Sequence, residues 1–410
     1  MQRGASPAAN PPRKTYVTPH RPCRSDWQPS ARAAGPPLSR RIRGRYNARR
    51  SIRLRPDESG LRRTGAAERR QAMRRSLCGL VILVLGVAAG CAPSVPGGRV
   101  KFANLAGIYY SASPATAGKP GVEVEAALVD ESETLLRRAV AQLNAEKNLD
   151  FVVLTGDLLA RADAASLDRA KGILADLAVP YYLVLGDHDG PAGAADAGAL
   201  SRTSVLWAFQ GHGFDGPEGY WCREVLPGLM LVGLDTAAGG RGKGHVDARQ
   251  LEWLDRTLAE HKDKAVLVAA HHGLMALHPL DEGSAWRDLL VDNGEAVRQV
   301  LARHANVLAV LTGHHHFADG RVSGRIVYLA APSVSVWPLA YHLVNLTKTE
   351  TEAVWVPLDQ GDLALRAQER LLASEMYRGV FPPGEDGDTA CVRLFGGGKM
   401  TVVPLPAIRP

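Results

Sequence analysis

The sequence predicts an α/β fold, and three features of the chain after residue 99 support this prediction. Short apolar, β-prone segments alternate with amphipathic helical segments along most of this part. Several of the apolar segments stop at a turn that carries Gly, Asp or His, as strands do where they border a site. Less helix separates the last apolar segments, so we expect some antiparallel structure in the second half.

The expected elements follow in order, each justified by its apolar pattern. The β-prone runs predict strands at residues 100–110, 151–154, 181–185, 229–234, 265–270, 307–311, 326–331 and 353–356. Apolar residues recurring on one helical face predict helices at residues 130–143, 166–177, 247–258, 293–304 and 362–375. Asp130-x-x-Glu133 resembles a capping box at the start of the first helix. A Gly-rich hairpin is expected around residues 396–398.

The first 72 residues carry most of the positive charge. The chain has a net charge of +7 and a pI of about 9.2. Residues 1–72 contain 18 Lys and Arg but only 4 Asp and Glu. Without these 72 residues and without Arg74 and Arg75, the rest of the chain has a net charge of −9. This Arg- and Pro-rich segment lacks apolar periodicity, so we expect it to be disordered or untranslated, with translation starting at Met73. An arginine-rich arm that binds nucleic acid is the alternative. We do not expect the acidic remainder of the chain to bind nucleic acid.

Residues 73–91 have the layout of a secretory signal. Two arginines precede an apolar run over residues 77–89 that is short for a membrane span. The run ends in Ala88-Ala-Gly-Cys91 and is similar to a bacterial lipoprotein signal. This implies lipidation at Cys91, a tether over residues 92–99, and export to the periplasm or the cell surface. A plain N-terminal anchor helix is the alternative.

Four of the expected strands end in side chains of the types that bind metal ions in proteins. The groups are Asp157, Asp187 with His188, His271 with His272, and the run from His314 to His316. Alternation gives His314 and His316 a shared direction and turns His315 elsewhere. Carboxylates and imidazoles without thiolates indicate Zn²⁺, Mn²⁺ or Fe. Such an ion lowers the pKa of its water and neutralises charge on a phosphate ester, and a nearby His can protonate the leaving alkoxide.

The ordered set of motifs resembles the calcineurin-like metallophosphoesterase superfamily. The motifs are Gly156-Asp157, Gly186-Asp-His-Asp189, His271-His272 and Gly313-His-His-His316. Two connecting stretches are similar to its cyclic nucleotide phosphodiesterase-like branch, Gln250-Leu-Glu-Trp-Leu254 and Ala330-Ala-Pro-Ser333. The resemblance covers about residues 101–345. It implies a four-layer α/β/β/α sandwich of the metallophosphoesterase type, with one or two divalent transition metal ions.

The resemblance also implies a role for each site residue. Asp157 would bridge two metals and His316 would bind the first. The second metal would be bound by Asp187, His271 and His314. His188 would act as general acid or contact the substrate phosphate, whereas His272 is interpreted as a core histidine.

The chain departs from the family at the first metal. The alignment places Gly107 where the family has an Asp ligand and Tyr109 where it has a His ligand. Tyr109 could bind iron as a phenolate, but we interpret it as an ordinary strand aromatic. Only Asp157 and His316 would remain, so we expect the first metal position to be weak or empty. Conceivable replacements are Asp130, Glu131 and Asp235.

Asp187 is a second departure, because the family usually has a neutral Asn there. The loss of one carboxylate and the gain of another keeps two in the set. Our hypothesis is therefore a mononuclear site on Asp157, Asp187, His271 and His314.

The sequence thus predicts an exported, lipid-anchored phosphoesterase that hydrolyses a small phosphomonoester or phosphodiester, nucleotide-like by resemblance, with metal-activated water. The alternative is a catalytically degenerate family member that binds a ligand or partner, for which Gly107 and Tyr109 are the evidence. We expect the phosphoesterase domain over residues 100–350 and an appended helix and hairpin over residues 351–410. The pairing of Cys222 with Cys391 is left open.

Overall fold

The computed structural model describes residues 95–113, 124–191, 198–240, 242–347, 350–359, 361–378 and 403–404. The expected tail and signal, most of the tether, Cys391 and the hairpin at residues 396–398 lie outside the described residues. Among the described residues, no helix is long and apolar enough to span a membrane. Cys222 is a free thiol there.

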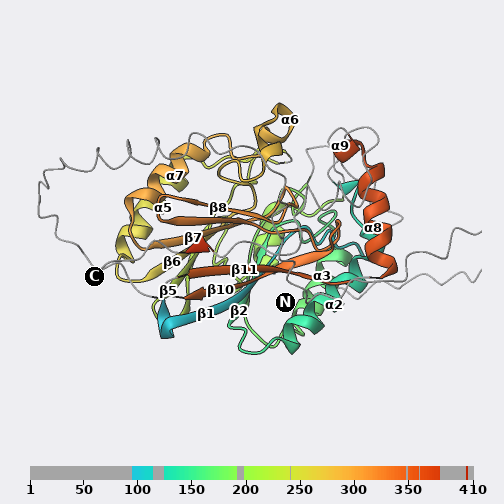
Figure 1. The fold of residues 1–410 in the computed structure, drawn as a ribbon, viewed down its shortest axis with the longest axis horizontal. Coiled ribbons are helices and arrows are strands. Elements are labelled where there is room, and N and C mark those ends of the chain that lie inside the picture. Colours follow the sequence, from blue (N-terminus) through green and yellow to red (C-terminus); the bar gives the residue numbers. More distant parts are fainter. Residues whose placement is uncertain are drawn as a thin grey trace, which may run out of the picture. The chain divides into compact units, whose positions relative to one another are not determined.

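The described strands form two six-stranded mixed sheets (Figure 1). The first has the order β12-β11-β10-β1-β2-β3. Its parallel part comprises β1 (Arg99–Leu105), β2 (Phe151–Thr155) and β3 (Tyr181–Val184), connected through α2 (Ser132–Ala145) and α3 (Ala164–Leu174). Antiparallel pairing adds β10 (Ala340–Thr347), β11 (Glu350–Pro357) and β12 (Val403–Pro404).

The second sheet has the order β4-β5-β6-β7-β9-β8. Its parallel centre comprises β5 (Leu229–Gly233), β6 (Ala265–Ala269), β7 (Val307–Thr312) and β9 (Ile326–Ala330). Antiparallel edges are formed by β4 (Trp221–Leu226) and β8 (Asp319–Ser323). The main connecting helices are α5 (Ala248–Glu260) and α7 (Gly294–Arg303), with the shorter α4 (Arg202–Ala208) and α6 (Ser284–Arg287).

Alternating side chains along the second sheet separate two hydrophobic clusters. In β5, Leu229 and Leu231 belong to the cluster shared with the first sheet. Met230 and Val232 belong instead to the cluster with α5 and α7. Because successive strand residues face opposite sides, the second sheet is covered by helices on one side and by the first sheet on the other.

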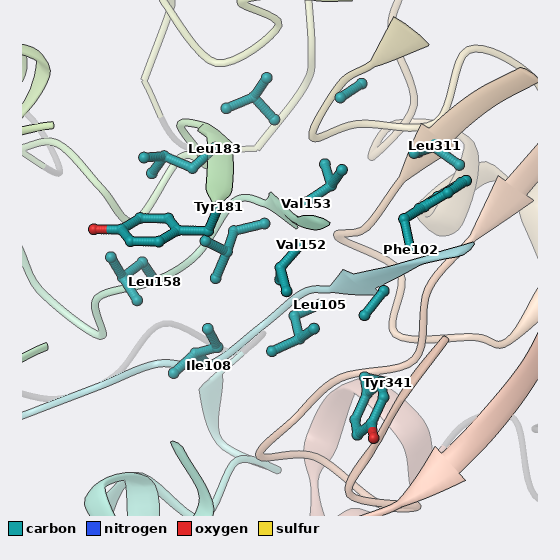
Figure 2. Packing of buried hydrophobic residues seen from close by; sticks show 14 of the residues in the cluster. Phe102, Leu105, Ile108, Val152, Val153, Leu158, Tyr181, Leu183, Leu311 and Tyr341 are labelled. Atoms are coloured by element: carbon teal, nitrogen blue, oxygen red, sulfur yellow. The ribbon is translucent and has the colours of Figure 1, made fainter. Parts of the chain in front are cut away.

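The cluster between the sheets is large and continuous. It joins Phe102 of β1 to Leu311 of β7 (Figure 2). Leu135 of α2 and Ala170 of α3 extend it to the helices on the first sheet. The layers therefore run α/β/β/α, as the sequence predicted.

The expected strands and the main helices are confirmed within a few residues, with four differences. The first strand ends at Leu105 and not at Tyr110. The capping box is wrong, because Glu131 is the N-cap of α2 and makes no side-chain cap. β4, β8 and β10 were not predicted. The C-terminal helix is divided into α8 (Asp362–Ala373) and α9 (Glu375–Arg378), and Arg366 of α8 pairs with Asp130 and Glu131.

Candidate metal centre

The polar residues that follow β2, β3, β6 and β7 meet at one place. β2 and β3 are parallel neighbours in the first sheet, and β6 and β7 in the second, so the carboxyl ends of each pair lie together. The side chains that follow the two pairs contact one another. All four of the residues proposed for a mononuclear site are buried: Asp157, Asp187, His271 and His314. The sequence therefore predicted correctly which strand ends come together.

His271 lies at the centre of this group. Its Nε2 is 3.0 Å from Nδ1 of His314 and 3.2 Å from Oδ1 of Asp187. Oδ2 of Asp157 lies 3.4 Å from the same nitrogen. The other ring nitrogen, Nδ1, donates a hydrogen bond to the carbonyl of Thr155 at 2.8 Å. A carbonyl acceptor of this kind fixes the tautomer of a metal-binding imidazole, leaving the opposite lone pair for the ion.

The backbone around these residues is strained. Among the described residues, six that are not glycine have positive φ, and four of them lie in this site: Tyr109, Asp157, His314 and His316. Left-handed backbone costs about 1–2 kcal/mol for a residue other than Gly. Strain of this kind gathers where side chains must be aimed at a particular point, which supports a functional site.

Buried charge shifts the pKa values of this group in opposite directions. Burial lowers the pKa of His271, but Asp157 and Asp187 outweigh burial and raise it to about 9. Burial raises the pKa of Asp157 to about 6. Burial would do the same at Asp187, yet the hydrogen bond to His271 and the nearby His314 hold its pKa well below the usual range. The cluster therefore holds a proton between carboxylates and imidazole that a divalent cation could displace.

The donor set fits a divalent metal ion. Ligand atoms from Asp187, His271, His272 and His314 lie within 4.8 Å of one another, and so do those from Asp157, Asp187 and His188. Two imidazole nitrogens at 3.0 Å need a proton or a cation between them. Oxygen and nitrogen donors without thiolate match Zn²⁺, Mn²⁺ or Fe.

His188 presents an unused nitrogen beside the donor set. Its backbone N–H donates to Oδ1 of Asp157 at 3.1 Å, and its Nδ1 lies 3.3 Å from the carbonyl of Ala160. Its Nε2 is buried and has no hydrogen-bond partner among the residues that the structure describes. Asp189 holds the turn by accepting from the backbone N–H groups of Gly186 and Leu159, each at 2.9 Å.

The two remaining histidines of the motifs make structural contacts. Nδ1 of His272 lies 2.9 Å from the hydroxyl of Thr236, and its Nε2 lies 2.9 Å from the carbonyl of Gly242. Both nitrogens thus have partners in the protein, as expected for a core histidine, although His272 belongs to the same group of donor atoms as Asp187, His271 and His314. His315 turns away and pairs with Asp281 at 2.7 Å, which agrees with the alternation expected along the turn.

A tyrosine hydroxyl lies where the first metal was expected. Oη of Tyr109 donates to Oδ2 of Asp157 at 2.8 Å and lies 3.0 Å from Nε2 of His316. The interpretation of Tyr109 as an ordinary strand aromatic is wrong, because β1 ends four residues earlier and Tyr109 occupies a turn with φ of 47°. His316 accordingly faces Tyr109 and stands outside the central donor set.

None of the conceivable replacements for the lost ligands joins the site. Asp130 and Glu131 pair with Arg366, and Asp235 pairs with Arg202. The structure adds Tyr377 of α9, whose hydroxyl lies 3.2 Å from Nδ1 of His316. No sequence pattern connects Tyr377 with the motifs, since it lies 61 residues beyond His316.

The fold and this cluster define an α/β protein with a buried site of carboxylates and imidazoles. Residues 130–318 match the family model of the calcineurin-like phosphoesterases, in agreement with the resemblance of the motifs to that superfamily.

Relatives of known name share this region. A probable cyclic nucleotide phosphodiesterase of Psychrobacter arcticus is 25% identical over 58% of this chain and 82% of its own length. The 3',5'-cyclic adenosine monophosphate phosphodiesterase CpdA of Escherichia coli K12 is 27% identical over 57% of this chain and 78% of its own length. A solved dimetal phosphatase from Danio rerio aligns with 64% of this chain and 97% of its own, at 20% identity and a TM-score of 0.49.

Proposed function

We propose that this protein is a metal-dependent phosphodiesterase. The observation that carries the proposal is the convergence of Asp157, Asp187, His271 and His314 on one buried point, beside the unused Nε2 of His188. A bound divalent ion supplies positive charge for the phosphoryl oxygens and lowers the pKa of water.

The residues of the chain have separate tasks in this reaction. The carbonyl of Thr155 fixes the His271 ring, so that its Nε2 would be the atom that binds an ion. The contact of His188 Nδ1 with Ala160 aligns the imidazole, and its Nε2 is proposed to carry the proton for the leaving alkoxide. The carboxylates of Asp157 and Asp187 would balance the charge of one divalent ion.

We propose that the centre holds a single Mn²⁺, Zn²⁺ or Fe ion. Two carboxylates and two imidazoles make a complete four-donor shell for one ion. A second ion would have Asp157 and His316 as its protein ligands, and the Tyr109 hydroxyl already contacts both.

For the substrate we propose a small phosphodiester of the cyclic nucleotide class. Support comes from the names of the similar proteins, several of which are cyclic nucleotide phosphodiesterases. A catalytically degenerate binding protein is less well supported, because ligand binding alone would not require the four convergent donors and the oriented His188.

The test is hydrolysis of bis(p-nitrophenyl) phosphate and of 3',5'-cyclic AMP by the full chain, stripped of metal and reloaded with Mn²⁺. Activity should need the metal, and His188→Ala should lower kcat by about a hundredfold or more. His304→Ala is the matched control, since His304 pairs with Asp255 at the end of α7. Metal-independent turnover, or equal activity of His188→Ala and wild type, would refute the proposal.

We also propose that the protein is exported and lipid-anchored through Cys91. The sequence of residues 73–91 supports this. Labelling of expressing bacteria with a palmitate analogue should mark wild type and not Cys91→Ala, and label on both proteins would refute the anchor.

A further inference from the structure

Tyr109, His316 and Tyr377 form a hydrogen-bonded chain that ends on the proposed metal ligand Asp157. Tyr109 and Tyr377 are completely buried, and His316 is nearly so. The three contacts measure 2.8, 3.0 and 3.2 Å, from Asp157 outward to Tyr377. The chain therefore links the C-terminal helix α9 to the metal centre.

The proton positions along this chain follow from the donor and acceptor capacity of each group. A carboxylate only accepts, so the Tyr109 hydroxyl donates to Asp157. The Tyr109 oxygen then accepts from Nε2–H of His316. With its proton on Nε2, His316 accepts at Nδ1 from the hydroxyl of Tyr377. One consistent arrangement of protons thus gives a hydrogen bond to each polar group of this hydrogen-bonded series, without an ion.

The backbone closes the same space from the other side. A Cβ added at Gly107 would lie 2.7 Å from Oγ of Ser333 and 3.2 Å from Cδ2 of His316. Ser333 and Ser335 both donate to the carbonyl of Gly107, at 2.7 and 2.8 Å. Ser333 therefore leaves little room for a side chain at this turn, and a carboxylate at this position would need Ser333 to move.

We propose that the Tyr109 hydroxyl substitutes for the first metal ion, and that Tyr109 is a positioning residue for a centre with one ion. Its hydrogen bond orients Oδ2 of Asp157, the oxygen that also faces His271 at 3.4 Å. Its ring meets the rings of His188 and His316 edge-on, at centroid distances of 5.2 and 5.6 Å, so it also buttresses the proposed acid. The inference rests on the proposed function in assuming that Asp157 binds metal.

The test compares Mn²⁺ binding by full-length wild type and four single variants. Metal per chain is counted by elemental mass spectrometry, affinity is measured by calorimetry, and electron paramagnetic resonance separates isolated from spin-coupled Mn²⁺. Thermal melts verify folding. The variants are Tyr109→Phe, Tyr109→His, Tyr377→Phe and the control Tyr328→Phe, a buried tyrosine in the cluster below α5 and α7.

Wild type should bind one ion with the spectrum of isolated Mn²⁺. Tyr109→Phe keeps the ring and should still bind one ion, about tenfold more weakly, because Asp157 loses its orienting partner. Tyr377→Phe should lower the affinity for Mn²⁺ by a smaller factor, and Tyr328→Phe should leave the affinity unchanged. Tyr109→His supplies a third donor beside Asp157 and His316, so a second ion and a spin-coupled signal should appear.

Several results would overturn the inference. They are two coupled ions in wild type, unchanged affinity in Tyr109→Phe, or a single ion in a folded Tyr109→His variant. Failure of the proposed function has a different signature, namely one ion bound as expected without phosphodiester hydrolysis. Absence of bound Mn²⁺ in wild type would refute both.

Discussion

Nδ1 of His314 lies 3.0 Å from Nε2 of His271, and both rings are buried, each two residues beyond the carboxyl end of its strand, β6 or β7. Since Nδ1 of His271 donates to Thr155, its Nε2 carries a lone pair unless the ring is protonated. Without an ion, the two carboxylates keep that proton in place, which is the cause of the raised pKa of His271. An ion and this proton therefore compete for one position.

Metal binding should release about one proton per chain near pH 7, because the pKa of His271 is raised to about 9 in the metal-free protein. Apparent metal affinity should then rise with pH up to about 9 and level off above it. Calorimetry in buffers of different ionisation enthalpy measures the protons released. Binding heats that do not depend on the buffer would contradict the competition.

Asp187→Asn should weaken binding of the single ion by about tenfold or more, since it removes one of two charges that balance the cation. Asn keeps the shape of the side chain and its contact with the backbone N–H of Gly242. Asp292→Asn, which alters an exposed pair with His245, is the control. Equal Mn²⁺ affinity in wild type and Asp187→Asn would contradict the hypothesis of a mononuclear site.

Gly156→Ala should disrupt the site. Gly156 has a φ of 90°, and a Cβ there would lie 2.2 Å from Nδ1 of His271. We expect a loss of about 2 kcal/mol or more in the free energy of unfolding, together with loss of metal binding. Gly172→Ala in the exposed part of α3 meets nothing within 4 Å and should stabilise by about 0.5–1 kcal/mol. Denaturant unfolding measures both, and equal stability of the two variants would contradict this reasoning.

His342 should make stability depend on pH. It is buried on β10, neither ring nitrogen has a hydrogen-bond partner in the described part of the chain, and burial lowers its pKa to about 3. The unfolded state, with a pKa near 6.5, binds more protons than the folded state at acid pH, so stability is full above about pH 6.5 and falls below it. Between pH 7 and pH 5 this histidine should lower the free energy of unfolding by about 2 kcal/mol.

The measurement is urea unfolding of wild type and His342→Leu at both pH values. The variant should lose about 2 kcal/mol less than wild type over this interval. Parallel pH profiles for the two proteins would show that His342 does not titrate as proposed.

Much of the fold could be predicted because its central strands are continuous apolar runs buried on both faces, such as Phe151–Thr155 and Val307–Thr312. β10 was missed because its half-exposed alternation includes His342 and Asn345, which interrupt the apolar pattern. β4 was missed for a similar reason, since Arg223 and Glu224 lie in its middle.

The donor set was predictable because each member follows its own strand, so a local motif fixes its position. The environment of Tyr109 was not, since a turn at φ of 47° and a contact with His316 cannot be read from local sequence. Tyr377 contacts the site only through the packing of α9. The resemblance did identify Gly107 and Tyr109 as departures, which was the one sequence signal for what lies there.

The most direct test of the single-ion centre is an anomalous difference map from crystals of the full chain grown with Mn²⁺. One peak per chain, within bonding distance of Asp157, Asp187, His271 and His314, is the expected result. In the same crystals, Oη of Tyr109 should remain hydrogen-bonded to Asp157. A second peak between Asp157 and His316, with the Tyr109 ring displaced, would contradict the account.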